Sequence, residues 1–274
     1  MKHWICKILI AVTVVTLCGC GRTETKDQES VSSQAEETAE TISQGKESWW
    51  LKRREGNQPP EVSDHIDLSK YDAYYIDPKV SKKKKCIYLT FDCGYENGFT
   101  PKILDVLKKQ KATAAFFVTK PFIRENPDLV KRMKKEGHVV GNHTVHHKSM
   151  PSLSDRDNKQ EILDCAEYCK EATGYEMDKF IRPPMGEYSE ESLALTKKLG
   201  YKTIFWSMAY VDFKVDEQPG KEFVIKHFDE YVHNGAIPLL HNVSQSNAEA
   251  LGDVIKQLRK KGFEFLSLKK LPDY

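Results

Sequence analysis

Two histidines four residues apart are the first feature of the chain that could do chemistry. Residues 141–147 (GNHTVHH) place His143 and His147 at a spacing that brings both imidazoles to one side of a helical turn, which suits a zinc-type ion. His146, three residues from His143, is a competing partner, and histidines clustered on a loop are often not ligands. The pair therefore predicts a divalent metal site only if other reactive residues lie beside it.

A carboxylate that could act as a general base stands in residues 90–94 (TFDCG). Asp92 follows the apolar, β-favouring run at residues 86–91, so it should lie at the end of a buried strand. Beside a metal ion, such a carboxylate can take a proton from a metal-bound water and so start the hydrolysis of an amide. An aspartate at a strand end can also be a simple turn residue, and this alternative stays open.

From residue 86 onward, short apolar segments alternate with amphipathic helical patterns. Helices are expected to begin near residues 100, 126, 154, 189, 221 and 247, and one of them should run from Ser154 to Gly174. The predicted strands cover residues 86–91, 114–118, 138–140, 180–182, 203–206, 236–240 and 264–266. This alternation predicts an α/β fold of parallel strands joined by crossover helices, and the polar motifs at the strand ends favour a barrel over an open sheet.

Chemically capable side chains follow the predicted strands. In a barrel of this kind the functional site lies at the carboxyl ends of the strands, so side chains placed there should converge on one face. The residues expected to meet there are Asp92, His143, His147, Arg182, Asp212 and His241.

The first 20 residues have the features of a secretory leader. Lys2 and Lys7 flank the start of a short apolar run at residues 8–17, which is too short to be a typical membrane span. The Leu-Cys-Gly-Cys that follows resembles a bacterial lipobox, in which Cys20 would become the lipidated N-terminus. An uncleaved signal anchor is the alternative. In either case we expect the remaining chain to lie outside the cytoplasmic membrane.

The composition divides the rest of the chain into three parts. Residues 21–48 contain almost no large apolar side chains and are expected to form a flexible tether. Residues 49–84 form a pre-barrel segment, and residues 85–274 are expected to form the catalytic domain.

The overall composition excludes several classes of protein. The 274 residues include 39% hydrophobic residues, which excludes wholesale disorder, and no long apolar run follows the leader, which excludes a multi-span membrane protein. The net charge is only +2, so no global field would recruit nucleic acid. Cys165 and Cys169 are four residues apart in a helical pattern and are expected in the core rather than in a disulfide framework.

Five motifs together resemble those of a known family. TFDCG, HTVHH, RPPMG at residues 182–186, WSMAYVDF at residues 206–213 and LLH at residues 239–241 look like the five ordered motifs of the NodB-type polysaccharide deacetylases, carbohydrate esterase family four. The resemblance covers roughly residues 85–271. It is closest to the delta-lactam-biosynthetic de-N-acetylases of spore formers, through stretches such as YENGFTPKILDVLKK and HNVSQSNAEAL, and it extends back to about Trp49.

The resemblance implies a deformed barrel of about seven parallel strands that hydrolyses the acetamido group of N-acetylmuramic acid in peptidoglycan. It implies one divalent metal ion, with zinc the expected ion, held by His143 and His147. Asp92 would be the base that activates the metal-bound water, and Arg182 would orient it.

The remaining roles implied by the resemblance concern the acid and the substrate. His241 would protonate the departing amine, and Asp212 would orient His241. The substrate-binding residues would be Pro184, Met185, Gly186 and Leu239.

Two positions depart from the family pattern. Cys93 stands where most members carry an aspartate that completes the metal shell. It could bind zinc as a thiolate, or water and substrate could complete a two-histidine site. Met185 stands where close relatives often carry arginine, which puts one contact to acidic groups of the substrate in doubt and leaves Met185 as a wall residue.

Two other functions stay open. One is a cell-wall N-acetylglucosamine deacetylase that confers lysozyme resistance. The other is a lipid-tethered carbohydrate-binding protein with a degenerate barrel, against which the retention of Asp92, His143, His147 and His241 argues. The expected partners are peptidoglycan glycan strands, and an amidase or a partner lipoprotein could also take part. The expected location is the outer face of the cell membrane, or the intermembrane space of the forespore for a sporulation enzyme.

Overall fold

The computed structural model describes residues 45–63, 65–81 and 84–274. The predicted leader and the tether up to residue 44 lie outside the described residues. The described residues, from 45 onward, belong to one compact unit. Within the described part of the chain, no helix is both long and apolar enough to cross a membrane.

A parallel seven-stranded sheet forms the centre of this unit. From one edge to the other, its strands are β12 (Leu239–His241), β6 (Leu89–Cys93), β7 (Ala114–Val118), β8 (Val139–Asn142), β9 (Phe180–Ile181), β11 (Lys202–Ile204) and β4 (Ala73–Tyr74). The register sets Asp92 opposite both His241 on β12 and Phe117 on β7. The carboxyl ends of the central strands therefore meet at one rim, which is where the reactive motifs are found.

Irregular bridges bring the two edges of the sheet together. The bridge between Met208 and Pro238 joins the chain after β11 to the chain before β12. The bridge between Ile76 and Ala236 joins the chain after β4 to the same segment before β12. The predicted α/β barrel of about seven parallel strands is confirmed. The barrel is deformed in that isolated bridges, and not a continuous ladder, join its two edges.

The set of seven strands differs from the predicted set in one member. The predicted strand at residues 264–266 is β13 (Phe263–Phe265), which pairs only with β5 (Lys85–Ile87), and β4 from the pre-barrel segment takes the place in the main sheet. The run at residues 86–91 is split because Tyr88 donates its N–H to Ala236 O at 2.9 Å between β5 and β6. Strand β4 has only two residues, too few for a periodic pattern to reveal it.

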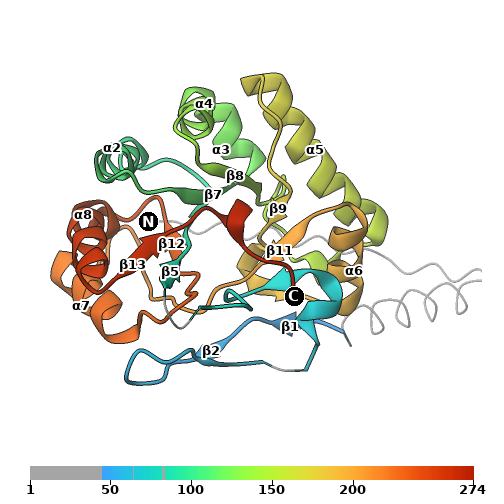
Figure 1. The fold of residues 1–274 in the computed structure, drawn as a ribbon. Coiled ribbons are helices and arrows are strands. Elements are labelled where there is room, and N and C mark those ends of the chain that lie inside the picture. The colour runs from blue at the N-terminus through green and yellow to red at the C-terminus, as the bar shows by residue number, and fades with distance from the viewer. Residues whose placement is uncertain (1–44, 64, 82–83) are drawn as a thin grey trace, which may run out of the picture. The chain divides into compact units, whose positions relative to one another are not determined.

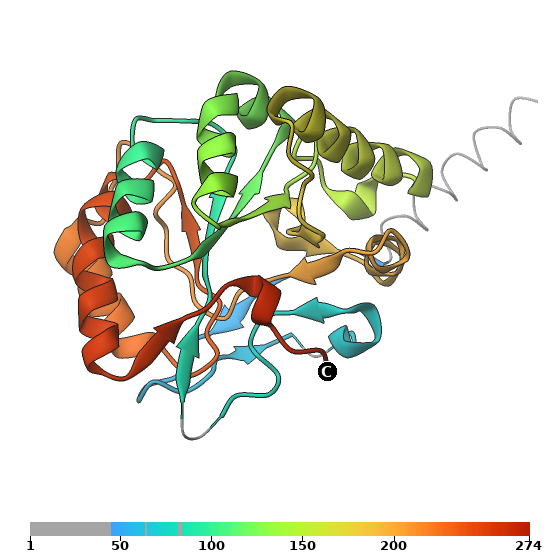
Figure 2. The ribbon, with the colours of Figure 1, turned by 45° about the horizontal axis from the view of Figure 1, so that its top comes forward.

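The helices form a layer around the outside of the strands (Figures 1 and 2). They are α2 (Thr100–Gln110), α3 (Lys120–Glu125), α4 (Pro127–Lys135), α5 (Asp155–Thr173), α6 (Glu190–Lys198), α7 (Lys221–Tyr231) and α8 (Gln245–Lys260). Helix α3 was not predicted, since it begins directly after β7 with no loop between them. Thr119 caps it by accepting a hydrogen bond from the N–H of Phe122.

Serine side chains cap the starts of three predicted helices, α5, α6 and α8. Ser154 accepts from the N–H of Asp157 at the start of α5, and Gly174 ends it with a φ of 77°. Helix α8 begins two residues before the predicted start, because Ser244 is its N-cap and accepts from the N–H of Asn247 at 3.2 Å. Asn247 therefore lies inside the first turn of α8.

Two hydrophobic clusters pack on opposite faces of the sheet. Leu89, Phe91 and Cys93 of β6 point outward into the cluster beneath the helices, whereas Phe117 of β7 points inward. Alternate residues of a strand face opposite sides, so Asp92 faces the inside of the barrel. The free Cys165 and Cys169 lie in the outer cluster, as predicted.

The pre-barrel segment is part of the same unit as the barrel. Strand β1 (Glu47–Ser48) pairs with β10 (Glu187–Tyr188), and β2 (Leu51–Lys52) pairs with β3 (Glu61–Val62). Figure 1 shows β1 and β2 on the side of the sheet opposite α3 and α4. The last residues of the predicted tether thus form a strand, and the expected division at residue 85 is not a structural boundary.

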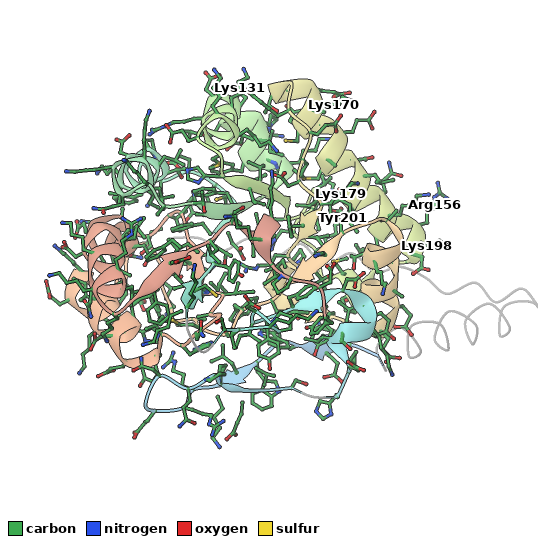
Figure 3. The ribbon with its side chains drawn as sticks, viewed as in Figure 1. Lys131, Arg156, Lys170, Lys179, Lys198 and Tyr201 are labelled. Carbon is green, nitrogen blue, oxygen red and sulfur yellow. The ribbon has the colours of Figure 1, made fainter. Side chains whose placement is uncertain are left out.

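Basic side chains project from the outer helices. Figure 3 shows Lys131 of α4, Lys170 of α5 and Lys198 of α6 projecting outward from the sheet. Lys131 pairs with Asp128 at 3.2 Å and Lys170 pairs with Glu176 at 2.6 Å. Lys131 and Lys170 are therefore paired locally with carboxylates.

Candidate active site

Four predicted residues line one cavity at the carboxyl rim of the sheet. The cavity has a volume of about 520 Å³ and is bordered by Asp92, His143, His147 and His241. Arg182 and Asp212 lie directly behind it and are fully buried. The structure therefore brings together all six of the residues that the sequence placed at strand ends.

Asp92 is held as a carboxylate by a buried ion pair. Arg182 donates from Nη1 to Asp92 Oδ1 at 2.8 Å. Burial alone would raise the pKa of Asp92, but the charges of Arg182, His143 and His241, with the Arg182 hydrogen bond, together hold this pKa below its ordinary value of 3.8. The second oxygen, Oδ2, lies 3.6 Å from His143 Nε2. Asp92 is thus ionised at neutral pH and has one oxygen free to accept a proton.

Backbone carbonyls fix the Arg182 side chain. Its Nε donates to Ile204 O at 3.0 Å and its Nη2 donates to Phe205 O at 3.2 Å, and the guanidinium lies 4.4 Å from the ring centroid of Phe117. These contacts leave Nη1 for Asp92 alone. Arg182 therefore positions the base rather than touching the cavity.

His143 presents a free nitrogen to the site. Its Nδ1 lies 2.9 Å from Arg182 O, and because a carbonyl only accepts, Nδ1 carries the proton and Nε2 keeps its lone pair. Burial lowers the pKa of His143 to about 4. The ring is therefore neutral at physiological pH, which is the form that binds a metal ion.

His147 lies beside His143 on a strained loop. The two ring centroids are 4.7 Å apart at an angle of 72°. His147 has a φ of 55° and Thr144 a φ of 67°, an uncommon conformation for non-glycine residues. Partial burial lowers the pKa of His147 below its ordinary value of 6.5, so this ring is also neutral at physiological pH.

A buried glutamate holds the histidine loop in place and keeps His146, the competing metal ligand, away from the cavity. Glu161 of α5 accepts from the N–H groups of Val145 and His146 at 3.0 and 2.7 Å and lies 2.6 Å from His146 Nδ1. His146 is thereby turned toward α5 and does not line the cavity. Sequence reasoning missed Glu161, because in an amphipathic helix it looks like any surface glutamate.

The structure does not place Cys93 with the histidines. Its side chain lies in the outer hydrophobic cluster, on the opposite face of β6 from Asp92. Burial raises the pKa of the Cys93 thiol well above its ordinary value of 9.0. Of the two alternatives for completing the metal shell, the geometry favours water and substrate over a Cys93 thiolate.

The donor set fits a divalent ion with an incomplete protein shell. Among the described residues, no group of three or more histidine, cysteine, aspartate or glutamate side chains is arranged to hold a metal. His143 and His147 offer two neutral imidazoles at the cavity, and the Arg182 carbonyl fixes the tautomer of His143 in the way that partners of metal-binding histidines do. Such a site would leave positions open for water and substrate.

His241 and Asp212 form the second reactive pair. Asp212 Oδ1 lies 2.6 Å from His241 Nδ1, and Oδ2 accepts from the His241 N–H at 2.8 Å. Burial disfavours protonation of His241, but the hydrogen bond and charge of Asp212 outweigh it and raise the pKa of the imidazole above 6.5. His241 is therefore held ready to donate a proton.

The expected substrate-binding residues are divided between the cavity wall and the interior. Met185, Gly186 and Leu239 line the cavity, whereas the preceding Pro183 lines it in place of Pro184. The Met185 side chain is half-exposed, and its backbone, with a φ of 58°, is in the left-handed conformation. Pro184 is buried in the 3-10 turn at Pro184–Gly186, and its contact with substrate stays a prediction.

Gly186 is required by a close approach to an aromatic wall. It has a φ of 69°, and a Cβ there would lie 2.7 Å from Trp206 Cη2. Trp49 supports the same wall by donating from its backbone N–H to Gly186 O at 2.8 Å and from its indole to Trp206 O at 2.9 Å. The sequence analysis identified Trp49 only as the start of the pre-barrel segment and of the family resemblance, so its support of the wall was missed.

Comparisons with known proteins agree with this geometry. The family model described as polysaccharide deacetylase matches residues 79–204. The peptidoglycan-N-acetylmuramic acid deacetylase PdaA of Bacillus subtilis is 44% identical over 232 residues, which cover 84% of this chain and 87% of PdaA. The chain belongs to the polysaccharide deacetylase family. The solved structure of PdaA, a family 4 carbohydrate esterase, matches this polysaccharide deacetylase with a TM-score of 0.78 and 45% identity over 82% of this chain and 96% of that one.

Two further relatives show the breadth of the polysaccharide deacetylase family. A peptidoglycan-N-acetylglucosamine deacetylase of Bacillus cereus is 32% identical over 203 residues, covering 73% of this chain and 94% of the relative. A family 4 pseudoenzyme from Bacillus anthracis has a TM-score of 0.66 and 26% identity over 73% of this chain and 68% of the pseudoenzyme. The geometry of the base, the acid and the two histidines therefore matters for assigning activity within the polysaccharide deacetylase family.

Proposed function

We propose that this polysaccharide deacetylase removes the acetyl group from N-acetylmuramic acid in peptidoglycan, with a divalent metal ion, zinc being the expected one. The observation that carries the proposal is the pairing of an ionised Asp92 with a protonatable His241 across a cavity that also holds two neutral imidazoles. The identity to a muramic acid deacetylase supports the choice of sugar. Delta-lactam formation in spore cortex is the role that we propose for the product.

The residues of the chain divide the hydrolysis into two proton transfers. His143 and His147 would hold the ion, which would supply Lewis acidity and make a nearby water more acidic. Asp92 takes the proton from the attacking water, and Arg182 holds its carboxylate in place. His241 gives a proton to the nitrogen as the C–N bond breaks, which releases acetate and a free amine. Apolar residues of the cavity wall, such as Trp206 and Leu239, exclude water around the acetyl group.

Release of acetate from purified peptidoglycan tests the activity. The protein is expected to release acetate in a reaction that a chelator stops and that added zinc restores, since the two imidazoles bind metal only while it is present. Absence of acetate release by the zinc-loaded protein would instead support a carbohydrate-binding protein.

Replacement of His241 by Ala is expected to lower kcat by about 10²-fold with little change in KM, because general acids typically contribute 10²- to 10⁴-fold. In the unaltered protein, activity should fall as pH rises through the pKa of His241, which lies above 6.5. This basic limb should be absent from the pH profile of His241→Ala. A variant that changes only KM would show that His241 binds substrate instead of donating a proton.

We further propose that the mature protein is lipid-anchored through Cys20 outside the cytoplasmic membrane. The short apolar run and the Leu-Cys-Gly-Cys sequence support this location. Cys20→Ser is expected to block lipidation and change the mass and membrane retention of the mature protein, with Cys18→Ser as the matched control. Unchanged mass and retention in Cys20→Ser would favour an uncleaved anchor.

A further inference from the structure

A third polar side chain contacts the His241–Asp212 pair from behind. Asn247, in the first turn of α8, donates from Nδ2 to Asp212 Oδ2 at 2.6 Å and to His241 O at 3.3 Å. Tyr210 in turn donates its hydroxyl to Asn247 Oδ1 at 2.6 Å. Both side chains are buried, and neither lines the cavity. Asn247 and Tyr210 therefore act on the site only through the pair.

The hydrogen bonds define which way the Asn247 amide faces. A carboxylate oxygen can only accept, so the NH₂ group must face Asp212 and the amide oxygen must face Tyr210. Burial raises the pKa of Tyr210 well above its ordinary value of 10.0, so its hydroxyl keeps its proton. The ring of Tyr210 is itself packed against His227, with centroids 4.7 Å apart.

The amide also limits rotation of the Asp212 carboxylate. Oδ2 accepts both the Asn247 side chain and the His241 N–H, while Oδ1 is left for His241 Nδ1 at 2.6 Å. Without Asn247, one of the two bonds that hold Oδ2 is lost. The carboxylate could then turn, and the imidazole that it aligns would turn with it.

We propose that Asn247 is a positioning residue for the His241–Asp212 pair, and that Tyr210 locks its amide in the donating orientation. The proposal deepens the proposed function and rests on it, because it assumes that His241 is the acid. Partners that orient metal-binding histidines typically change activity 10- to 100-fold, and we expect an effect of the same order for Asn247, which acts on the imidazole through Asp212.

The charged groups around His241 are separate from Asn247. The imidazole responds to the charges of Asp212, Asp92 and Arg182, and His147 faces it across the site. Phe213 covers one side of the ring, with centroids 5.4 Å apart. Asn247 adds no charge of its own, so its removal should act by orientation, whereas a carboxylate in its place should act by charge.

Kinetics of Asn247→Ala and Asn247→Asp test the proposal. Asn247→Ala is expected to lower kcat 10- to 100-fold and to leave KM within about twofold, because the residue does not touch substrate. Asn247→Asp is expected to move the basic limb of the pH profile to higher pH, because an added negative charge favours the protonated imidazole. Tyr210→Phe should lower kcat by a smaller factor in the same direction. A rise in KM alone, or an unchanged kcat in Asn247→Ala, would overturn the proposal.

Asn234→Ala is the matched control. Asn234 also makes two amide hydrogen bonds, accepting from Cys86 N at 2.9 Å and donating to Ser81 O at 2.8 Å, but it lies outside the cavity lining. It should leave kcat, KM and the pH profile unchanged. An equal fall in kcat in this variant would show that loss of any structural amide has the same effect, which would contradict a positioning role for Asn247.

Proton NMR gives a measurement that does not depend on activity. In the unaltered protein, the Nδ1 proton of His241 is shared with Asp212 and should give a downfield signal protected from exchange with water. Asn247→Ala should broaden or remove this signal, whereas Asn234→Ala should retain it. Loss of the signal in a protein without deacetylase activity would uphold the positioning role while refuting the proposed function. Retention of the signal in Asn247→Ala would refute the positioning role even if the enzyme is active.

Discussion

Replacement of Asp92 by Asn is expected to lower kcat by about 10³-fold, within the range that general bases contribute. The amide keeps the shape of the side chain and its acceptor for Arg182, but it cannot take a proton from water. Because the pKa of Asp92 lies below 3.8, the unaltered carboxylate is ionised across the neutral range, so the loss should be seen at every pH near neutrality. Steady-state kinetics on a deacetylase substrate measure the effect.

Stability must be followed in the same variant, because Asp92→Asn leaves the Arg182 guanidinium buried without its counter-charge. Breaking one partner of a buried pair typically costs about 3–5 kcal/mol. In the unaltered protein this contribution is fully present above pH 3.8 and is lost as pH falls through the lower pKa of the folded state. Circular dichroism and zinc content should show a folded variant that retains its metal. A folded, zinc-loaded Asp92→Asn with near-normal turnover would remove Asp92 from its role as base.

Replacement of His143 or His147 by Ala is expected to remove most of the bound metal and with it the activity. Each variant removes one of two imidazoles, and Cys93 cannot take its place because it faces the other side of β6. Elemental analysis and zinc titration measure the loss directly. Full metal occupancy in both variants would show that the ion binds elsewhere.

His146→Ala is the matched control for the metal variants. His146 is three residues from His143, but its Nδ1 lies 2.6 Å from Glu161 and its ring is outside the cavity. The variant should bind a full equivalent of zinc. Metal loss in His146→Ala equal to that in His143→Ala would instead implicate the loop as a whole.

The strand ends were predictable because parallel strands share one direction. Once residues 86–91 and 236–240 were predicted to be parallel strands, Asp92 and His241 were expected at the same rim, and the register sets them directly opposite one another. The capping pair Ser154 and Gly174 likewise fixed the bounds of α5. These features depend on local patterns, which a single sequence contains.

Contacts between distant segments could not be predicted in this way. Glu161 and Asn247 act through hydrogen bonds to the histidine loop and to Asp212. Glu161 looks like a surface residue of a helix, and Asn247 was expected only near the start of a helix, so the sequence did not reveal either contact. Cys93 was ambiguous because either face of a short apolar strand could have been the inner one. Strand β4 depends on pairing with β11, more than a hundred residues away along the chain.

Mass spectrometry of muropeptides before and after incubation with the zinc-loaded protein is the most direct test of the central proposal. Peptidoglycan with and without stem peptides should be digested, and the sugar that has lost an acetyl group should be located by fragmentation, with Asp92→Asn as the inactive control. The predicted result is a muramic acid residue without its N-acetyl group, or the delta-lactam derived from it. Loss of acetyl groups only from N-acetylglucosamine would contradict the proposed substrate.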